Sequence, residues 1–115
     1  GQLKQLDVGV NGNVWGVNYD NLIFYRLGST GSNTGSNWVH VPGILKQLSV
    51  TPSGGIWGVN PNNFIYYKAS STAPWQLVSG NLKYVDVDED GVPYGIKPNG
   101  KISYRDGVTP TDPIG

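Results

Sequence analysis

The sequence predicts an all-β protein: a β-propeller of four-stranded antiparallel blades, with three blades in this chain. The first observation is a near-repeat, because VWGVN at 14–18 returns as IWGVN at 56–60. Self-similarity at long spacing indicates a repeated structural unit. The second is composition, since 17 glycines, 8 prolines, 4 tryptophans and 7 tyrosines indicate short strands joined by tight turns. The third is that no segment sustains an apolar period of about 3.6 residues, so we expect almost no helix.

Three segments of the chain align with one another. They are GQLKQLDVGVNGNVWGVNYDNLIFYR (1–26), GILKQLSVTPSGGIWGVNPNNFIYYK (43–68) and GNLKYVDVDEDGVPYGIKPNGKISYR (80–105). Each opens with Gly-x-Leu-Lys, carries an aromatic residue followed by glycine, and closes with tyrosine and a cation. These units place the blades at 1–42, 43–79 and 80–115 of a single propeller unit spanning 1–115.

Each unit is expected to supply four strands. The first strands are expected at 3–8, 45–50 and 82–87, the second around each aromatic–glycine pair, the third at 22–26, 64–68 and 101–105, and the fourth at 38–41 and 75–78. Asparagine, glycine and proline between them suit tight turns. Four strands in a unit of about 40 residues are typical of a propeller blade.

The third unit is the weakest of the three. Its fourth strand would fall at 108–114, VTPTDPI, which holds two prolines and no tryptophan. Proline cannot donate to a β-ladder, so this segment is expected to be an edge strand or a loose tail. Pro93 opens the second strand of this unit and predicts that the strand begins one residue late.

The repeated residues resemble the tectonin-repeat propellers, the family of fish-egg lectins and tachylectin-1-like lectins. The shared pattern is W-x-x-V-x-G-x-L-K, then G-x-V-W-G-V-N, then I-Y-Y-K, and it extends across essentially the whole chain. Tyr94 and Lys97 depart from it, as does the missing tryptophan of the last outer strand. The resemblance implies a propeller with more blades than three and binding of glycans or microbial surface sugars.

The repeated VWGVN is interpreted as packing between blades rather than as a sugar-stacking platform. Trp15 and Val17 would point to one side of the strand, and Gly16 to the other. We expect Gly16 and Gly58 to leave room for the large ring of a neighbouring blade, because buried aromatic rings dominate protein cores.

Three blades do not close a ring, since propellers use about 4–8. An isolated wedge would expose two apolar blade faces to water. Two such wedges around a twofold axis would complete six blades, so we expect a homodimer in which blades one and three meet. The alternative is that the chain is part of a longer propeller.

Polar residues gather on one predicted rim, because loops after the second and fourth strands of a blade share a side. The candidate carbohydrate-binding residues there are Asn18, Asp20, Asn21, Asn60, Asn62, Asn63, Lys97 and Asn99. Amides offer donors and acceptors together, which suits sugar hydroxyls, and repetition suits multivalent binding. The alternative is that asparagine fills these turns because it tolerates a left-handed backbone.

Five further candidates lie on the third and fourth strands. Arg26, Lys68 and Arg105 close the third strands and could bind sugar hydroxyls or acidic glycans, or could be solvated edge cations that discourage strand addition. Trp38 and Trp75 begin the outer strands and could stack on a sugar or cover the outer edge of a blade.

The segment DVDEDG, residues 86–91, is a weak candidate for a calcium site. Asp86, Asp88 and Asp90 have the spacing that opens a calcium loop, but the closing glutamate is absent because Lys97 stands there. The equivalent turns of the other units favour a plain acidic turn. We expect no cofactor, with calcium as a weaker possibility.

Composition excludes several function classes. The net charge is zero, which argues against nucleic acid as a partner, and no apolar stretch approaches a membrane span. Cysteine is absent, so disulfides and thiolate sites are excluded. His40 is the only histidine and no catalytic motif surrounds it, so we expect a non-enzyme.

The sequence therefore predicts a lectin that binds glycans on cell or microbial surfaces, with an extracellular location. If the protein is secreted, its signal segment has been removed, because the chain has no basic-then-apolar start. A non-lectin propeller fragment that acts as a protein-interaction scaffold is the alternative.

Overall fold

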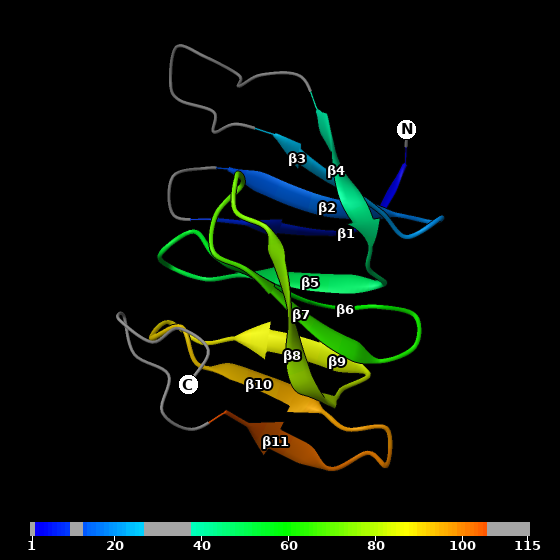
Figure 1. Ribbon diagram of the computed structural model, residues 1–115, viewed down its shortest axis with the longest axis vertical. Helices are drawn as coiled ribbons and strands as arrows, with labels where there is room; N and C mark the ends of the chain where they lie inside the picture. The colour runs from blue at the N-terminus through cyan, green and yellow to red at the C-terminus, as the bar shows by residue number, and fades with distance from the viewer. Residues whose placement is uncertain (1, 10–12, 27–37, 106–115) are drawn as a thin grey trace.

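The computed structural model describes residues 2–9, 13–26 and 38–105, and these form three antiparallel sheets stacked side by side (Figure 1). Sheet one contains β1 (Leu3–Val8), β2 (Val14–Asn18), β3 (Leu22–Arg26) and β4 (Val39–Ile44). Sheet two contains β5 (Gln47–Val50), β6 (Ile56–Val59), β7 (Phe64–Lys68) and β8 (Trp75–Asn81). Sheet three contains β9 (Tyr84–Val87), β10 (Pro93–Ile96) and β11 (Ile102–Tyr104). The described ranges contain no helix, and so none that could span a membrane.

The strand order follows the chain within each sheet, as the four-strand units predict. β1, β3 and β7 have the predicted bounds, whereas β5 and β9 each begin two residues later than predicted. β4 and β8 continue past their predicted ends to Ile44 and Asn81, beyond the predicted blade limits at 42 and 79. The predicted last strand at 108–114 lies outside the described residues.

The prediction that Pro93 delays its strand is wrong. β10 begins at Pro93, which pairs with Val87 of β9. On the other side, the Pro93 carbonyl accepts a hydrogen bond from the Arg105 backbone N–H at 3.1 Å. Proline lacks only the donor, so a first strand position that is used as an acceptor tolerates it.

Each junction between sheets joins two different faces, which we call the front and the back. The front of sheet one packs Trp15, Val17, Ile23, Tyr25 and Val41 against Leu45, Leu48 and Ile56 on the back of sheet two. The front of sheet two repeats this with Trp57, Val59, Ile65, Tyr67 and Val78 against Val85 of sheet three. Trp57 is 1% exposed and packs against Tyr67, with ring centroids 5.0 Å apart and ring planes tilted by 49°. VWGVN and IWGVN are therefore packing segments.

The expectation that Gly16 and Gly58 leave room for a ring of a neighbouring blade is wrong. The nearest atoms to a Cβ built at Gly58 belong to Leu45 of the same unit, with Cδ2 at 3.0 Å and Cδ1 closer still. Gly16 makes the equivalent contact with Leu3, whose Cδ1 would be 2.8 Å away. The glycine leaves room for the leucine of its own Gly-x-Leu-Lys segment, not for the ring of a neighbouring blade.

Side-chain amides join the first strands of neighbouring sheets. Gln5 of β1 accepts from the Leu48 backbone N–H at 3.0 Å and donates to the Leu48 carbonyl at 2.9 Å. Gln47 of β5 holds Val85 in the same way, at 2.8 and 2.5 Å. β1, β5 and β9 are edge strands whose outer backbone groups need partners. Each amide supplies a donor and an acceptor there, and we call this pair of bonds the amide bracket.

The first prediction concerns Leu45 and Gly58. Gly58→Ala should lower the free energy of unfolding by about 1–3 kcal/mol, because the new methyl group would overlap a buried leucine. Leu45→Ala opens space at the same point, so the double variant should be more stable than the sum of the two single losses predicts. Urea denaturation of the four proteins measures this coupling. Strictly additive losses would contradict the contact.

The second prediction concerns pH. Burial raises the pKa of Tyr67 above its usual value of 10.0, so the folded protein disfavours tyrosinate. The stabilisation from a neutral Tyr67 is complete below pH 10 and is lost as pH rises from 10 through the raised value. Tyr67→Phe keeps the ring packed against Trp57 and should lose less stability between about pH 8 and pH 11 than the parent. Equal losses in denaturant melts at both pH values would contradict this assignment.

Candidate functional site

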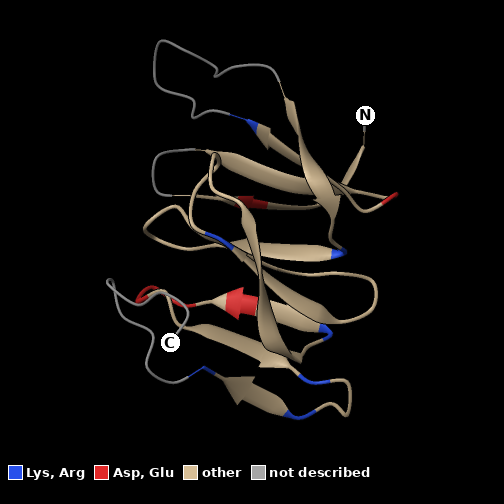
Figure 2. Cartoon of the chain, viewed as in Figure 1, with Lys and Arg blue, Asp and Glu red and all other residues tan. Residues whose placement is uncertain are grey.

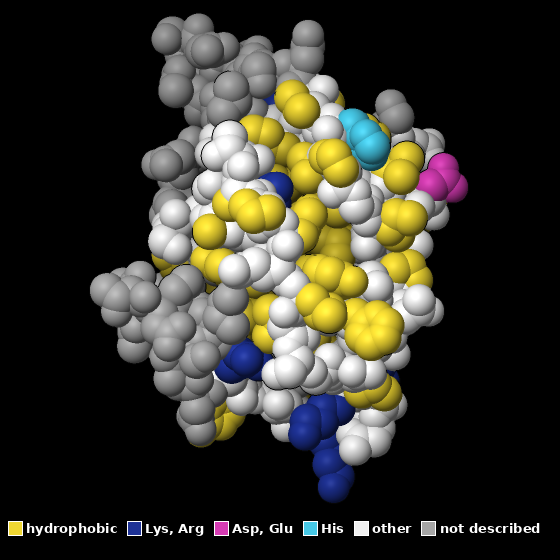
Figure 3. All heavy atoms as spheres, in the orientation of Figure 1, with side chains coloured by type: hydrophobic (Ala, Val, Ile, Leu, Met, Phe, Trp, Pro, Cys, Tyr) yellow, Lys and Arg dark blue, Asp and Glu magenta, His cyan; other side chains and the backbone are white. Residues whose placement is uncertain are grey.

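Three cavities lie at equivalent positions, one against the back of each sheet. Cavity A, about 300 Å³, lies between sheets one and two and is lined by Ile23, Gly43, Ile44, Leu45, Asn60, Tyr66 and Trp75. Cavity B, about 320 Å³, lies between sheets two and three and includes Ile65, Gly80, Asn81, Leu82, Lys97, Ser103 and Arg105. Cavity C, about 450 Å³, lies on the back of sheet one and is lined by Gln2, Leu3, Leu6, Asn18, Phe24 and Trp38. On the face shown in Figure 3, hydrophobic side chains gather around a hollow at the centre.

The three cavities share one plan. The last residue of the repeated second-strand segment lines each one, as Asn60 in A, Lys97 in B and Asn18 in C. The leucine of Gly-x-Leu-Lys and the middle residue of the third strand also line all three. In A and B an isoleucine of the preceding sheet forms the opposite wall. Cavity C has no such wall among the described residues.

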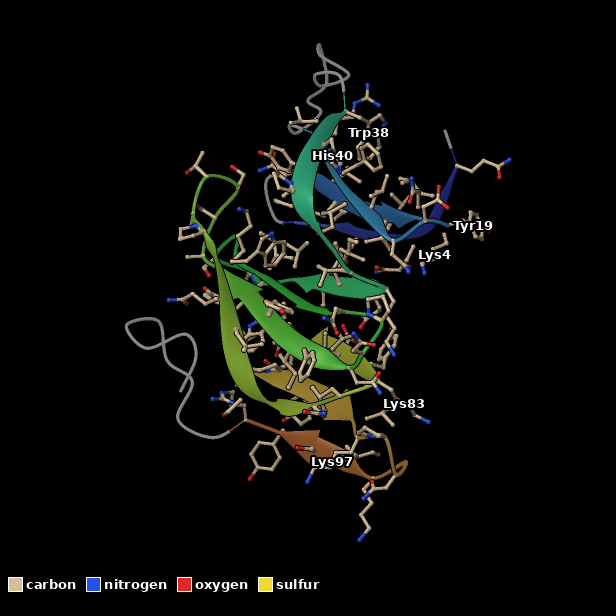
Figure 4. The ribbon with its side chains drawn as sticks, turned by 45° about the vertical axis from the view of Figure 1, so that its right-hand side comes forward. Lys4, Tyr19, Trp38, His40, Lys83 and Lys97 are labelled. Carbon is tan, nitrogen blue, oxygen red and sulfur yellow. The ribbon has the colours of Figure 1, made fainter. Side chains whose placement is uncertain are left out.

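The predicted tryptophans form walls of two cavities. The Trp75 indole lines cavity A and donates its Nε1 hydrogen to the Pro42 carbonyl at 3.1 Å. Trp38 lines cavity C and is more exposed, at 41%; it directly precedes β4, and Figure 4 shows it near His40. His40 is exposed, and its ring centroid lies 5.5 Å from that of Phe24.

The cations that close the third strands of sheets one and two hold these tryptophans. Lys68 lies with Nζ 5.3 Å from the Trp75 ring centroid, and Arg26 lies with Cζ 5.9 Å from that of Trp38. Lys68 is 7% exposed and donates to the Ala73 carbonyl, and burial lowers its pKa. The interpretation of Lys68 as a solvated edge cation is therefore wrong. Both cations orient an aromatic wall from the side and line none of the three cavities.

Asn18 and Asn60 stabilise their turns through one atom. Asn60 Oδ1 accepts from the backbone N–H groups of Asn62 and Phe64, at 3.0 and 2.9 Å. Asn18 Oδ1 makes the same pair of bonds to Asp20 and Leu22. No described residue accepts a hydrogen bond from Nδ2 of Asn60, so the amide donors are available to a ligand in cavity A.

The other rim candidates serve the turns. Asn21 and Asn63 have positive φ, at 64° and 70°, and their side-chain oxygens accept from Lys4 and Lys46. Their carbonyls accept from the backbone N–H groups of Leu45 and Leu82, which fixes the entry to the next sheet. Asn99 Oδ1 accepts from the Lys101 N–H at 3.0 Å. The residues of this set that line none of the three cavities are Asp20, Asn21, Asn62, Asn63 and Asn99.

Cavity B has a different chemistry from cavity A. Lys97 and Arg105 bring two cations to its lining, where cavity A has the neutral Asn60 and Trp75. Trp57 also lines cavity B, and its Nε1 atom is buried without a hydrogen-bond partner among the described residues. A buried donor without an acceptor costs free energy.

Sequence reasoning missed the middle residues of the third strands, which are Phe24, Tyr66 and Ser103. They line cavities C, A and B respectively. The signal was present in LIFYR, FIYYK and KISYR, because the middle position changes between units while the isoleucine and tyrosine beside it repeat. A variable position inside a repeated strand indicates a surface with its own role.

The two rims differ in charge (Figure 2). One rim, which we call the basic rim, contains the turns between second and third strands and the connections between sheets. It carries one acidic residue, Asp20, and five lysines: Lys4, Lys46, Lys83, Lys97 and Lys101. Figure 4 shows Lys4 and Lys83 along the same edge as Tyr19. The other rim carries the acidic turn of sheet three, at 86–90. The basic rim lies on the side where Asn18, Asn60 and Lys97 end their segments.

The family comparison agrees with this repeat plan. The family model of the Tectonin domain matches residues 1–115. The chain belongs to the Tectonin family. No curated protein matches this tectonin chain. Among solved structures it is similar to a propeller described as YCF48 bound to D1 peptide, with 20% identity and a TM-score of 0.59. That match covers 91% of the tectonin chain and 34% of the YCF48 chain, and it shows the β-propeller fold alone.

The acidic turn of the tectonin chain is built like its asparagine turns. Asp88 Oδ1 accepts from the backbone N–H groups of Asp90 and Val92, both at 2.9 Å. Asp86 Oδ1 lies 3.1 Å from the Ser49 hydroxyl and points to the neighbouring sheet. Within the described ranges no three histidine, cysteine or acidic side chains are grouped as a metal site would need. The D-x-D-x-D pattern is accounted for by turn and junction hydrogen bonds.

The third prediction separates the two roles of Asn60. Asn60→Ala removes two turn hydrogen bonds and should cost about 1–2 kcal/mol of stability. Asn60→Asp keeps the accepting oxygen, as Asp88 does in its own turn, and should change stability by less than about 0.5 kcal/mol. Thermal melts of the two variants provide the measurement. Equal destabilisation would show that the turn needs more than the oxygen.

Proposed function

We propose that the chain is a carbohydrate-binding lectin module whose sugar sites are the repeated cavities on the backs of its sheets. The observation that carries this proposal is the recurrence of one cavity plan in which a polar residue of the second-strand segment accompanies a leucine and a variable third-strand residue. Repeated sites suit a repetitive target, such as glycans on a cell or microbial surface. The proposal makes the protein a binding module and not an enzyme.

Cavity A has the chemical features that a neutral sugar needs. Tyr66 and Trp75 supply aromatic surface for the apolar face of a sugar ring. The Asn60 amide can donate to a hydroxyl while its oxygen remains in the turn. A volume of about 300 Å³ suits one or two sugar residues rather than a long chain.

Cavity B favours an acidic sugar. Its two cations, Lys97 and Arg105, give the lining a positive charge that can attract a carboxylate. Ser103 stands where cavity A has Tyr66, so the cavity B wall is more polar at this point.

The fourth prediction tests both sites through variants that exchange their residues. On a glycan array the parent should bind neutral and acidic glycans as separable classes. Lys97→Asn gives cavity B the residue of cavity A, and it should weaken acidic-glycan binding at least about tenfold while neutral binding stays. Asn60→Asp keeps the turn but replaces two donors, so it should remove neutral binding and leave acidic binding unchanged.

The control for this experiment is Asn62→Ala, which changes an exposed rim asparagine outside the three cavities. Its binding should equal that of the parent. Each array is repeated with a calcium chelator, and equal signals are expected because the lining residues named above include no carboxylate. A blank array on folded protein would contradict the proposal and favour the alternative, a protein-interaction scaffold.

We also propose that the three sheets are three consecutive blades of a six-bladed ring. The support is the constant direction of packing, with the front of each sheet against the back of the next. Propellers of about 4–8 blades close by repeating such a contact. The front of sheet three and the back of sheet one then need a partner.

A further inference from the structure

We propose that a second copy of this chain covers the back of sheet one with the front of its own sheet three, and that cavity C becomes a sugar site built from two chains. The sugar in this inference rests on the function proposed above, whereas the pairing of the two faces does not. Among the described residues no sheet covers the front of sheet three or the back of sheet one, so two copies of the chain can pair these faces around a twofold axis.

The free front of sheet three repeats the residues that fill the two internal junctions. Tyr94, Ile102 and Tyr104 stand where sheet two has Trp57, Ile65 and Tyr67. Ile65 is 6% exposed against sheet three, whereas Ile102 is 81% exposed and Tyr104 is 60% exposed. The same kind of side chain is therefore buried in sheet two, where the back of the next sheet covers it, and exposed in sheet three, where no described sheet covers it.

The free back of sheet one shows the complementary pattern. Leu6 is 55% exposed, although its equivalents Leu48 and Val85 are 1% and 0% exposed beneath a preceding front. Val8 is 59% exposed on the same strand. The chain already forms a front-to-back interface twice, and the two free faces are the two halves of a third one. The front of sheet three in one copy is therefore the partner of the back of sheet one in the other copy.

Closure would complete cavity C. Ile23 forms the opposite wall of cavity A, and Ile65 that of cavity B, each contributed by the preceding sheet. Cavity C has Asn18, Phe24 and Trp38 but no preceding sheet. Ile102 of the partner subunit has the equivalent position, so the closed assembly gives cavity C the same wall. Asn18 and two aromatic side chains make the completed cavity resemble cavity A, so it would bind neutral sugars.

The new junction lacks the amide bracket of the internal ones. Tyr84 occupies the position at which Gln5 and Gln47 form their amide brackets. The backbone of Leu6 in the partner subunit would therefore receive no bracket. Closure is expected to be weaker than either internal junction, and it can be strengthened by restoring the amide.

The experiment measures the mass of the 115-residue chain by sedimentation from about 1 to 100 µM. The parent should sediment as a dimer of 12.4 kDa chains at the upper concentrations. Ile102→Asp should give a folded monomer, because this side chain contacts little within its own chain. Leu77→Asp is the matched control, since Leu77 is 65% exposed on a central sheet and should leave the dimer intact. Tyr84→Gln should lower the dimer dissociation constant about tenfold by adding two hydrogen bonds.

The sugar site is tested on the same proteins by calorimetry with galactose, mannose and N-acetylglucosamine, each titrated separately. The parent dimer should bind a neutral sugar at two sites per chain, and the Ile102→Asp monomer at one. A folded parent that stays monomeric, or an Ile102→Asp variant that stays dimeric, would overturn the pairing of the two faces. A dimer that binds a neutral sugar at only one site per chain would keep the pairing and the proposed function but overturn the sugar site in cavity C.

Discussion

The contact between the leucine of Gly-x-Leu-Lys and the glycine of the second strand is the interaction on which the stack of sheets depends. Leu45 lies over Gly58 of its own unit, where a side chain would leave it no space. From there it reaches the core that Trp15, Val17 and Ile23 build on the preceding sheet. One side chain therefore links the connection between sheets, the centre of one sheet and the core of the junction. The two motifs recur together because each needs the other.

The amide brackets give the stack its second constraint. A propeller blade leaves the outer edge of its first strand unpaired, which is costly when that edge is buried. Gln5 and Gln47 satisfy the backbone of the next first strand with both ends of an amide. The bracket always runs from one sheet to the next along the chain, in the same direction as the front-to-back packing. The junctions therefore have a polarity, and this polarity makes the two free faces complementary instead of identical.

Much of the fold could be predicted because the three repeated units can be aligned and compared with one another. The strands at 3–8, 22–26 and 64–68 follow from three aligned copies. The errors concern contacts that no alignment of residue types contains. The sequence shows that Gly58 follows a tryptophan, but it does not show that Leu45 fills the space above it. The missing N–H of proline suggests a late start for the strand at Pro93, although only the carbonyl is needed there. Residue type alone places all the rim asparagines in one candidate binding set. In the fold, Asn21 and Asn63 serve turn geometry, whereas Asn60 serves both a turn and a cavity.

Asn60 has two roles, one in its turn and one in the lining of cavity A. These two roles indicate how such a fold can vary its ligands while its strands and turns stay the same. The oxygen of this side chain holds the turn, while its amide hydrogens have no acceptor among the described residues and the residue lines cavity A. In sheet three the turn is held differently, with Gly100 at a φ of 87° and the Asn99 oxygen on the Lys101 N–H. The backbone of Lys97 still closes this turn, but the turn needs no side-chain acceptor at position 97, so a lysine can stand there. Ser103 in place of Tyr66 changes the same cavity from the third strand. Two positions in each unit therefore set the chemistry of a cavity, while the leucine, the glycine and the brackets hold its shape.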